Sequence, residues 1–200
     1  MLDTALIQQL FAPRASLFFT RGSGLLARAI RWGERDPRKN EEVSWANHVG
    51  VVTRSGYITR PPVGQDAQVS EALWKIMHQS WWEAHKGENT DVAIFRRRDM
   101  NLLQETDIVR DALTRTGNKY AWWRLLGYLG ERFTKIKFSK MFVLKDRNVC
   151  SNHVGLAYAA AGITFPEPPG QLDPDEIFDH CIANPVLWEF MGWSIVTGEK

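Results

Sequence analysis

The chain has 200 residues, 44% of them hydrophobic, and its 25 basic and 23 acidic side chains leave a net charge of +2. This length and composition suffice for one buried core and exclude a disordered chain or a fibrous repeat. We expect a single domain over residues 1–200, and the even mixture of charges argues against a nucleic-acid partner.

Strand patterns dominate the first hundred residues. An amphipathic stretch at 2–11 predicts a helix that Pro13 closes, and apolar residues at helical spacing after two glycines predict another helix at 25–32. Elsewhere, runs of β-branched and aromatic residues, or apolar residues at alternate positions, indicate strands. The expected strands are 15–20, 43–53, 57–58, 67–76 and 90–96.

Helical patterns dominate the second half. Apolar residues recur there at helical spacing, and Gly117 and Gly162 stop two of the segments. The expected helices are 101–116, 122–133, 150–161 and 173–182. Strands clustered before residue 100, with helices mostly after it, predict an α+β domain.

Neither the amino terminus nor any apolar run indicates export or a membrane span. Asp3 stands in a stretch where a secretion signal has basic residues, and the longest apolar runs fall far short of the roughly 20 residues that cross a bilayer. We therefore expect a cytoplasmic protein whose cysteines stay reduced. No histidine- or cysteine-rich pattern predicts a metal site, and we expect no cofactor.

Nine tryptophans are an unusual number for a chain of this length. They fit ordinary core packing, and they equally fit an aromatic-lined groove that holds an acyl chain, a sugar or a peptide. The sequence leaves both interpretations open.

Cys150 stands where the helix expected at 150–161 begins. Unpaired backbone N–H groups and the helix dipole stabilise a thiolate at such a position, and the thiolate is the nucleophilic form. Cys150 is therefore a candidate for covalent catalysis, provided that another part of the chain supplies a base. Cys181, within an apolar helical segment, is expected to be an inert buried thiol.

Histidine is the side chain best suited to act as that base near neutral pH. His48 lies in the β-branched strand 43–53, where a rigid scaffold can aim its ring, although a purely structural strand histidine fits the same pattern. His153 projects from the same helix as the cysteine, which makes its approach awkward. His78, His85 and His180 have no matching pattern and are expected to be structural or surface residues.

A histidine base also needs a polar partner that fixes its tautomer. Glu71 shares a strand face with Val69 and Leu73, so its carboxylate is expected to point inward, where a buried charge demands a partner. The alternative is an edge-strand glutamate in water.

Four short motifs follow one another along the chain. They are Asn47-His48-Val49-Gly50-Val51-Val52, Ser70-Glu71-Ala72, Gly117-Asn118-Lys119-Tyr120 and Cys150-Ser151. In this order they resemble the circularly permuted papain-like cysteine hydrolases related to the NlpC-type amidases, in the YiiX/YebB-like branch. Those families place the histidine strand before the cysteine helix, the reverse of the order in papain. The resemblance implies an α+β fold, with an antiparallel sheet or small barrel packed against helices and the nucleophile at a helix N-terminus.

The resemblance also implies a role for each matching residue. Cys150 would be the nucleophile, His48 the general base and then acid, and Glu71 the third member of a catalytic triad that orients His48. The Tyr120 hydroxyl would help the Cys150 backbone N–H to bind the oxyanion.

The implied reaction is acyl transfer through a thioester. The first interpretation is a cysteine amidase or peptidase that cuts an amide, isopeptide or ester bond in a peptide or in cell-wall material. The second is a thioesterase or acyltransferase that acts on an acyl lipid, as in families resembling lecithin:retinol acyltransferase. The third is a binding protein that keeps the fold without turnover, because a fold alone does not establish a function.

Overall fold

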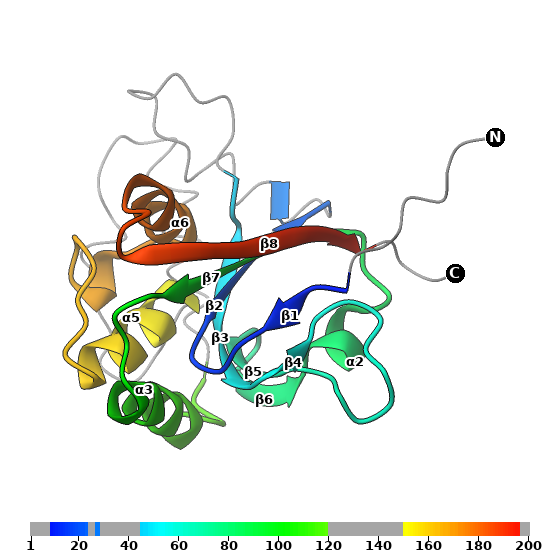
Figure 1. Ribbon diagram of the computed structural model, residues 1–200, viewed down its shortest axis with the longest axis horizontal. Coiled ribbons are helices and arrows are strands. Elements are labelled where there is room, and N and C mark those ends of the chain that lie inside the picture. Colours follow the sequence, from blue (N-terminus) through cyan, green and yellow to red (C-terminus); the bar gives the residue numbers. More distant parts are fainter. Residues whose placement is uncertain (1–8, 24–26, 29–44, 120–149, 197–200) are drawn as a thin grey trace.

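An antiparallel six-stranded sheet forms the centre of the computed structural model, which describes residues 9–23, 27–28, 45–119 and 150–196 (Figure 1). The strand order across the sheet is β6-β5-β3-β2-β7-β8. These strands are β2 (Leu17–Gly22), β3 (His48–Arg54), β5 (Gln68–Ala72), β6 (Ile76–Ser80), β7 (Thr90–Arg97) and β8 (Trp188–Val196). A second, two-stranded sheet pairs β1 (Phe11–Ala12) with β4 (Gly56–Tyr57).

Side-chain caps fix the starts of two of the helices. Asn101 with Gln104, and Asp173 with Glu176, form capping boxes that satisfy the first backbone N–H groups of α3 (Leu102–Thr114) and α6 (Pro174–Ala183). No helix in the described part of the chain is long and apolar enough to cross a bilayer. The described helices are α2 (Trp81–His85), α3 (Leu102–Thr114), α5 (Cys150–Ala160) and α6 (Pro174–Ala183), with a 3-10 turn at Pro169–Gln171.

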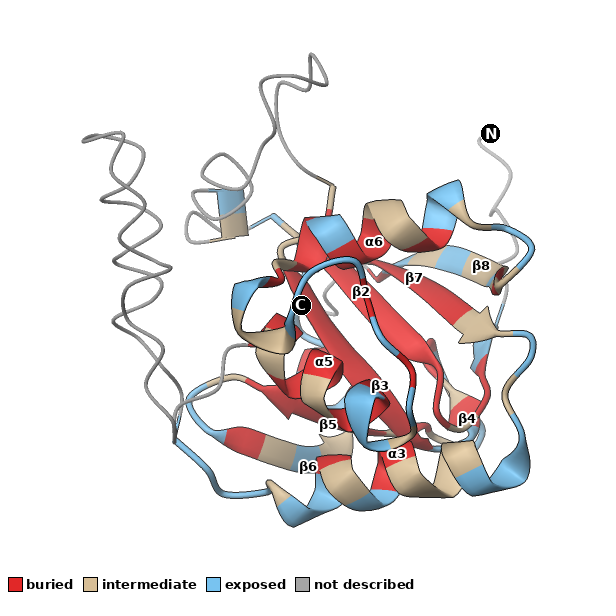
Figure 2. Ribbon diagram, turned by 90° about the vertical axis from the view of Figure 1, so that its left-hand side faces the viewer, coloured by how far each residue is buried: buried red, intermediate tan, exposed pale blue. Residues whose placement is uncertain are grey.

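The large sheet has a core on each face. The helices α3, α5 and α6 lie on one side, and α2 with β1 and β4 lies on the other (Figure 1 and Figure 2). Successive strand residues point to opposite faces, so Val49 of β3 joins the core under the three helices, whereas Val52 joins the core around Trp81. His48 and Gly50 alternate with Val49 and therefore face the α2 side.

The α+β class that the sequence indicated and the antiparallel sheet that the resemblance implied are both present, and among the described strands the sheet is open rather than a closed barrel, with β6 and β8 outermost. The strand expected over 67–76 is wrong at its end, because a bend at 73–74 and the isolated bridge residue Lys75 separate β5 from β6. No sequence pattern predicted β8, which alternates poorly because much of this edge strand is exposed.

Three helix predictions fall partly or wholly outside the described residues. The helix expected over 2–11 is wrong at Phe11, which pairs with Tyr57 in the small sheet, and residues 2–8 lie outside the description. The helix expected over 122–133 lies outside it entirely, as does most of 25–32.

Gly50 allows β3, β2 and β5 to approach closely beside the site described below. It pairs with Phe18 on one side and Glu71 on the other. A Cβ at this position would lie 2.4 Å from two Phe18 ring carbons and 2.9 Å from the Ser70 carbonyl oxygen. The Phe18 ring in turn packs against Trp81, with ring centroids 6.5 Å apart, so the ring has little room to move.

We predict that Gly50→Ala lowers the free energy of unfolding by about 1–3 kcal/mol, because overpacking forces Phe18 or the β5 backbone to shift. Urea denaturation measures this change. The matched control is Gly87→Ala, where a Cβ would meet no atom within 4 Å, and its change should stay within about 0.5 kcal/mol. Equal effects of the two substitutions would contradict the packing argument.

Candidate functional site

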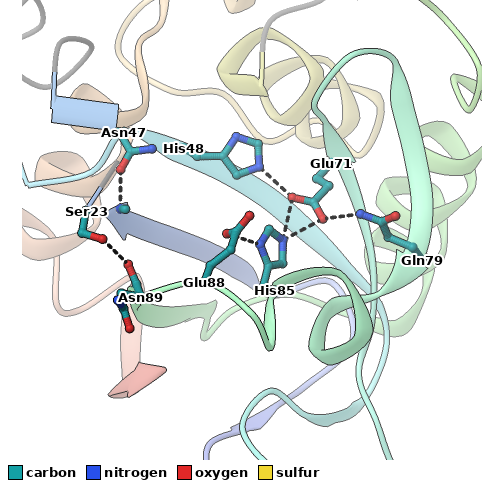
Figure 3. Close-up of polar contacts among 9 residues, drawn as sticks. Ser23, Asn47, His48, Glu71, Gln79, His85, Glu88 and Asn89 are labelled. Carbon is teal, nitrogen blue, oxygen red and sulfur yellow. Dashed lines mark hydrogen bonds and ion pairs between the residues drawn. The ribbon is translucent and has the colours of Figure 1, made fainter. Parts of the chain in front are cut away.

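The Glu71 carboxylate on β5 is the centre of a buried polar cluster. Its side chain is fully buried. His48 Nε2 lies 2.8 Å from Oε2, His85 Nε2 lies 3.1 Å from Oε1 and 3.3 Å from Oε2, and Gln79 donates to Oε1 at 3.0 Å (Figure 3). Three N–H donors from β3, α2 and β6 therefore satisfy one buried carboxylate, which lies on an inner strand as its alternating neighbours indicated.

His48 begins β3, and its ring is held on two sides. Glu71 binds Nε2, and Phe18 packs against the ring with centroids 6.0 Å apart. Because Nε2 is engaged, Nδ1 is the ring nitrogen that remains for another partner. Only 9% of His48 is exposed.

The backbone before His48 is anchored to α6 and β2. Asp175 Oδ1 accepts from the N–H groups of Trp45 and Ala46, at 2.8 and 3.2 Å. Asn47 donates its backbone N–H to the Thr20 carbonyl at 3.0 Å, and its side-chain oxygen accepts from the Gly22 N–H at 2.7 Å. These bonds fix where β3 starts and therefore where the imidazole stands.

Cys150 is the first described residue of α5 and is 5% exposed. Two contacts dock this end of the helix: Ser151 Oγ donates to the Leu172 carbonyl at 2.7 Å, and His153 Nε2 lies 2.9 Å from Ser70 Oγ. The Cys150 side chain lies close enough to His48 to contribute to the electrostatics of its ring.

Burial and neighbouring charges shift the pKa values of three residues in this cluster: His48, Glu71 and His85. Burial on its own lowers the pKa of His48, but interactions with the Cys150 and Glu71 side chains raise it to about 10. Burial on its own raises the pKa of Glu71, but hydrogen bonds from His48 and His85 bring it well below its usual range. Burial lowers the pKa of His85, whereas Glu71 and Glu88 raise it to about 9. The cluster is therefore a network of buried, mutually compensated charges.

His153 belongs to the core between α5 and β5. It is fully buried, and burial together with the nearby Arg115 charge lowers its pKa to about 4. The neutral His153 ring hydrogen-bonds to Ser70 of β5 and thereby attaches α5 to the sheet. The geometry supports this structural role for His153.

The structure brings three of the four residues singled out in the sequence together: Cys150, His48 and Glu71. Tyr120 lies outside the described residues. Of the two alternatives expected for His85, a structural or a surface residue, the structure excludes the surface one, because His85 is 6% exposed and contacts Glu71 directly. Trp81 and His85 lie four residues apart on one face of α2, but a five-residue helix is too short for a helical period to show in the sequence.

Comparisons with known proteins show a likeness of fold. No protein-family model matches the sequence, and no curated protein matches it. A similar solved structure is the crystal structure of the metalloprotein YiiX from Escherichia coli O157:H7, with a TM-score of 0.50 and 18% sequence identity. The similarity covers 78% of this chain and 70% of YiiX. The protein therefore has a YiiX-like fold.

The raised pKa of His85 predicts a specific dependence of stability on pH. Between the ordinary histidine pKa of 6.5 and the folded value of about 9, His85 binds a proton in the folded state that it lacks in the unfolded state. The free energy of unfolding should therefore fall as the pH rises through this window, by up to about 1.4 kcal/mol per pH unit.

Chemical denaturation at pH 6, 7.5 and 9 measures this slope. His85→Gln removes the titrating ring and should make the slope shallower. A slope that is unchanged in this variant would show that His85 does not carry the predicted shift.

Proposed function

We propose that the protein is a cysteine hydrolase that cleaves an amide, isopeptide or ester bond through a thioester on Cys150. The observation that supports this proposal is the alignment of three buried side chains: Glu71 binds one nitrogen of His48, and the Cys150 thiol lies near the same ring. A nucleophile, a base and a group that orients the base are the elements of a cysteine-histidine-carboxylate site.

The order of elements supports a circularly permuted papain-like interpretation of the YiiX-like fold. The histidine strand β3 precedes the cysteine helix α5 in the chain, and Cys150 is the first described residue of that helix. In the proposed site the thiol stands at the N-terminus of α5, where the helix dipole favours the thiolate.

In the proposed resting state, the Cys150 thiolate and the His48 imidazolium form an ion pair. With its pKa raised to about 10, His48 is protonated near neutral pH, and an adjacent cation favours the thiolate form of cysteine. Glu71 accepts the Nε2–H bond, so Nδ1–H is the ring donor that remains, and it is proposed to interact with the sulfur.

The proposed reaction has two halves. In the first, Cys150 Sγ attacks the carbonyl carbon, His48 gives its Nδ1 proton to the leaving amine or alcohol, and a thioester forms as the scissile bond breaks. In the second, neutral His48 takes a proton from water, the hydroxide attacks the thioester, and the acid product leaves with the thiolate restored. The Cys150 backbone N–H and Tyr120 are the proposed oxyanion donors.

YiiX is described as a metalloprotein, and the residues of the present site do not fit a metal. Within the described ranges, no group of three or more histidine, cysteine, aspartate or glutamate side chains could hold a metal ion. The two Glu71 oxygens are already taken up by three N–H donors. The proposed mechanism assigns no step to a metal.

A thioesterase or acyltransferase that acts on lipids is the second candidate, and an exposed apolar patch favours it. Phe190, Trp193 and Ile195 on the edge strand β8 are each more than half exposed, at 52%, 58% and 53%. Exposed patches of this kind mark contacts with proteins or membranes. Trp81 and Trp188, in contrast, are buried in the core. Some tryptophans therefore fill the core, and others are exposed on the surface.

We predict that iodoacetamide at pH 7 modifies Cys150 much faster than Cys181. Cys181 is 1% exposed, and burial raises the pKa of its thiol well above the usual value. His48→Ala removes the cation beside Cys150 and should slow its modification about tenfold or more. Peptide mass mapping measures both rates. Equal labelling of the two cysteines, or no effect of His48→Ala, would favour a binding protein without turnover.

A substrate panel separates the two enzymatic candidates. We expect release of product from peptide amides or isopeptides if the first candidate is correct, and from long-chain acyl esters alone if the second is correct. Cys150→Ala should abolish either activity and serves as the control. Activity that survives in Cys150→Ala would contradict both.

A further inference from the structure

His85 is a buried histidine that the proposed mechanism leaves without a role. It ends α2, its ring lies 4.8 Å from the Trp81 ring, and it contacts two carboxylates. Nε2 lies 3.1 and 3.3 Å from the two Glu71 oxygens, and Nδ1 lies 2.9 Å from Glu88 Oε2 (Figure 3). Each ring nitrogen therefore faces a carboxylate.

This geometry specifies the protonation state of His85. A neutral imidazole carries one N–H donor and one acceptor nitrogen, and an ionised carboxylate can only accept. Both ring nitrogens must carry hydrogen for both contacts to be hydrogen bonds, so His85 is an imidazolium. His48 differs, because only its Nε2 faces a carboxylate.

Among the described residues, the side chains that pair with the His85 ring are carboxylates. From β5 it faces Glu71, from the segment after α2 it faces Glu88, and the neutral Gln79 of β6 shares the Glu71 carboxylate. On its own helix, Lys86 pairs with Glu83, and both of these side chains are exposed. Beyond Glu71 stands His48.

A second cation beside Glu71 changes how readily His48, the proposed base, releases its proton. A buried carboxylate with one cationic partner holds that partner strongly in its protonated form. A second imidazolium on the same carboxylate offsets part of its charge, so His48 releases its proton more readily. The same positive charge also acts on the Cys150 sulfur, which lies near the His48 ring.

We propose that His85 is a positioning residue, a buried imidazolium that fixes the Glu71 carboxylate and shares its charge, so that His48 can cycle between its protonated and neutral forms. The proposal rests on the proposed function, because it assigns His85 to the same site. It deepens that function by adding a second histidine, with Glu88 as the link to the surface, where 57% of the Glu88 side chain is exposed.

The charge of His85 can be measured without any turnover. Nitrogen-15 NMR of the histidine rings at pH 7 should show both His85 nitrogens protonated. Glu88→Gln removes the negative charge beside Nδ1 but keeps an amide oxygen that can accept its N–H, so it should lower the pKa of His85, and this exposed position carries little risk for folding. A neutral His85 at pH 7 would overturn the proposal, whatever the outcome for catalysis.

The influence on the nucleophile is read from the pH profile of Cys150 alkylation. His85→Gln keeps an N–H donor for Glu71 but removes the charge, and should move the acid limb of the profile to higher pH by about one unit. Lys86→Gln, which removes an exposed cation one residue away, is the matched control and should leave the profile in place. If the acid limb of the alkylation profile lies at the same pH in His85→Gln as in the wild-type protein, His85 has only a structural role.

These results separate this proposal from the proposed function. If wild-type Cys150 shows no preferential alkylation over Cys181, the proposed function fails. If the preference is present and depends on His48 but not on His85, the function stands and the role of His85 is refuted.

Discussion

The structure around the site depends on one buried carboxylate that must be paired. Removing an ionised glutamate from water costs several kcal/mol unless hydrogen bonds and opposite charges replace the lost hydration. Glu71 meets this requirement with donors from β3, β6 and α2, three elements that must all be correctly placed at once. The pairing register of β5 carries the same constraint, because a slip by one residue would turn Glu71 to the opposite face of the sheet.

Two neighbouring residues of β5 connect the two faces of the sheet. Ser70 points toward the helices and bonds His153 of α5, while Glu71 points toward α2 and bonds His48 and His85. One strand thus anchors the helix that carries Cys150 and also orients the histidine. Fixing both from a single rigid element is how a scaffold holds reacting groups in a constant geometry.

Local patterns were enough to find the strand residues of the site but not the residues that join them from a distance. His48 lies in a β-branched run and Glu71 alternates with apolar neighbours, so the fixed period of a strand indicated their placement. His85 sits in a five-residue helix, too short for a helical period to show, and Gln79 lies in a strand whose pattern merges with that of β5. The edge strand β8 pairs with β7 across about half of the chain, and such pairings leave no local signal.

Trapping the covalent intermediate tests the central claim most directly. The protein is mixed with an activated short-chain ester such as p-nitrophenyl acetate, quenched in acid during turnover, and examined by peptide mass spectrometry. The account predicts an acetyl group on Cys150 that hydroxylamine removes, with a larger fraction acetylated when His48→Gln slows the attack of water more than the formation of the thioester. Ester hydrolysis that proceeds at the wild-type rate in Cys150→Ala, or an acetyl group found only on another side chain, would contradict it.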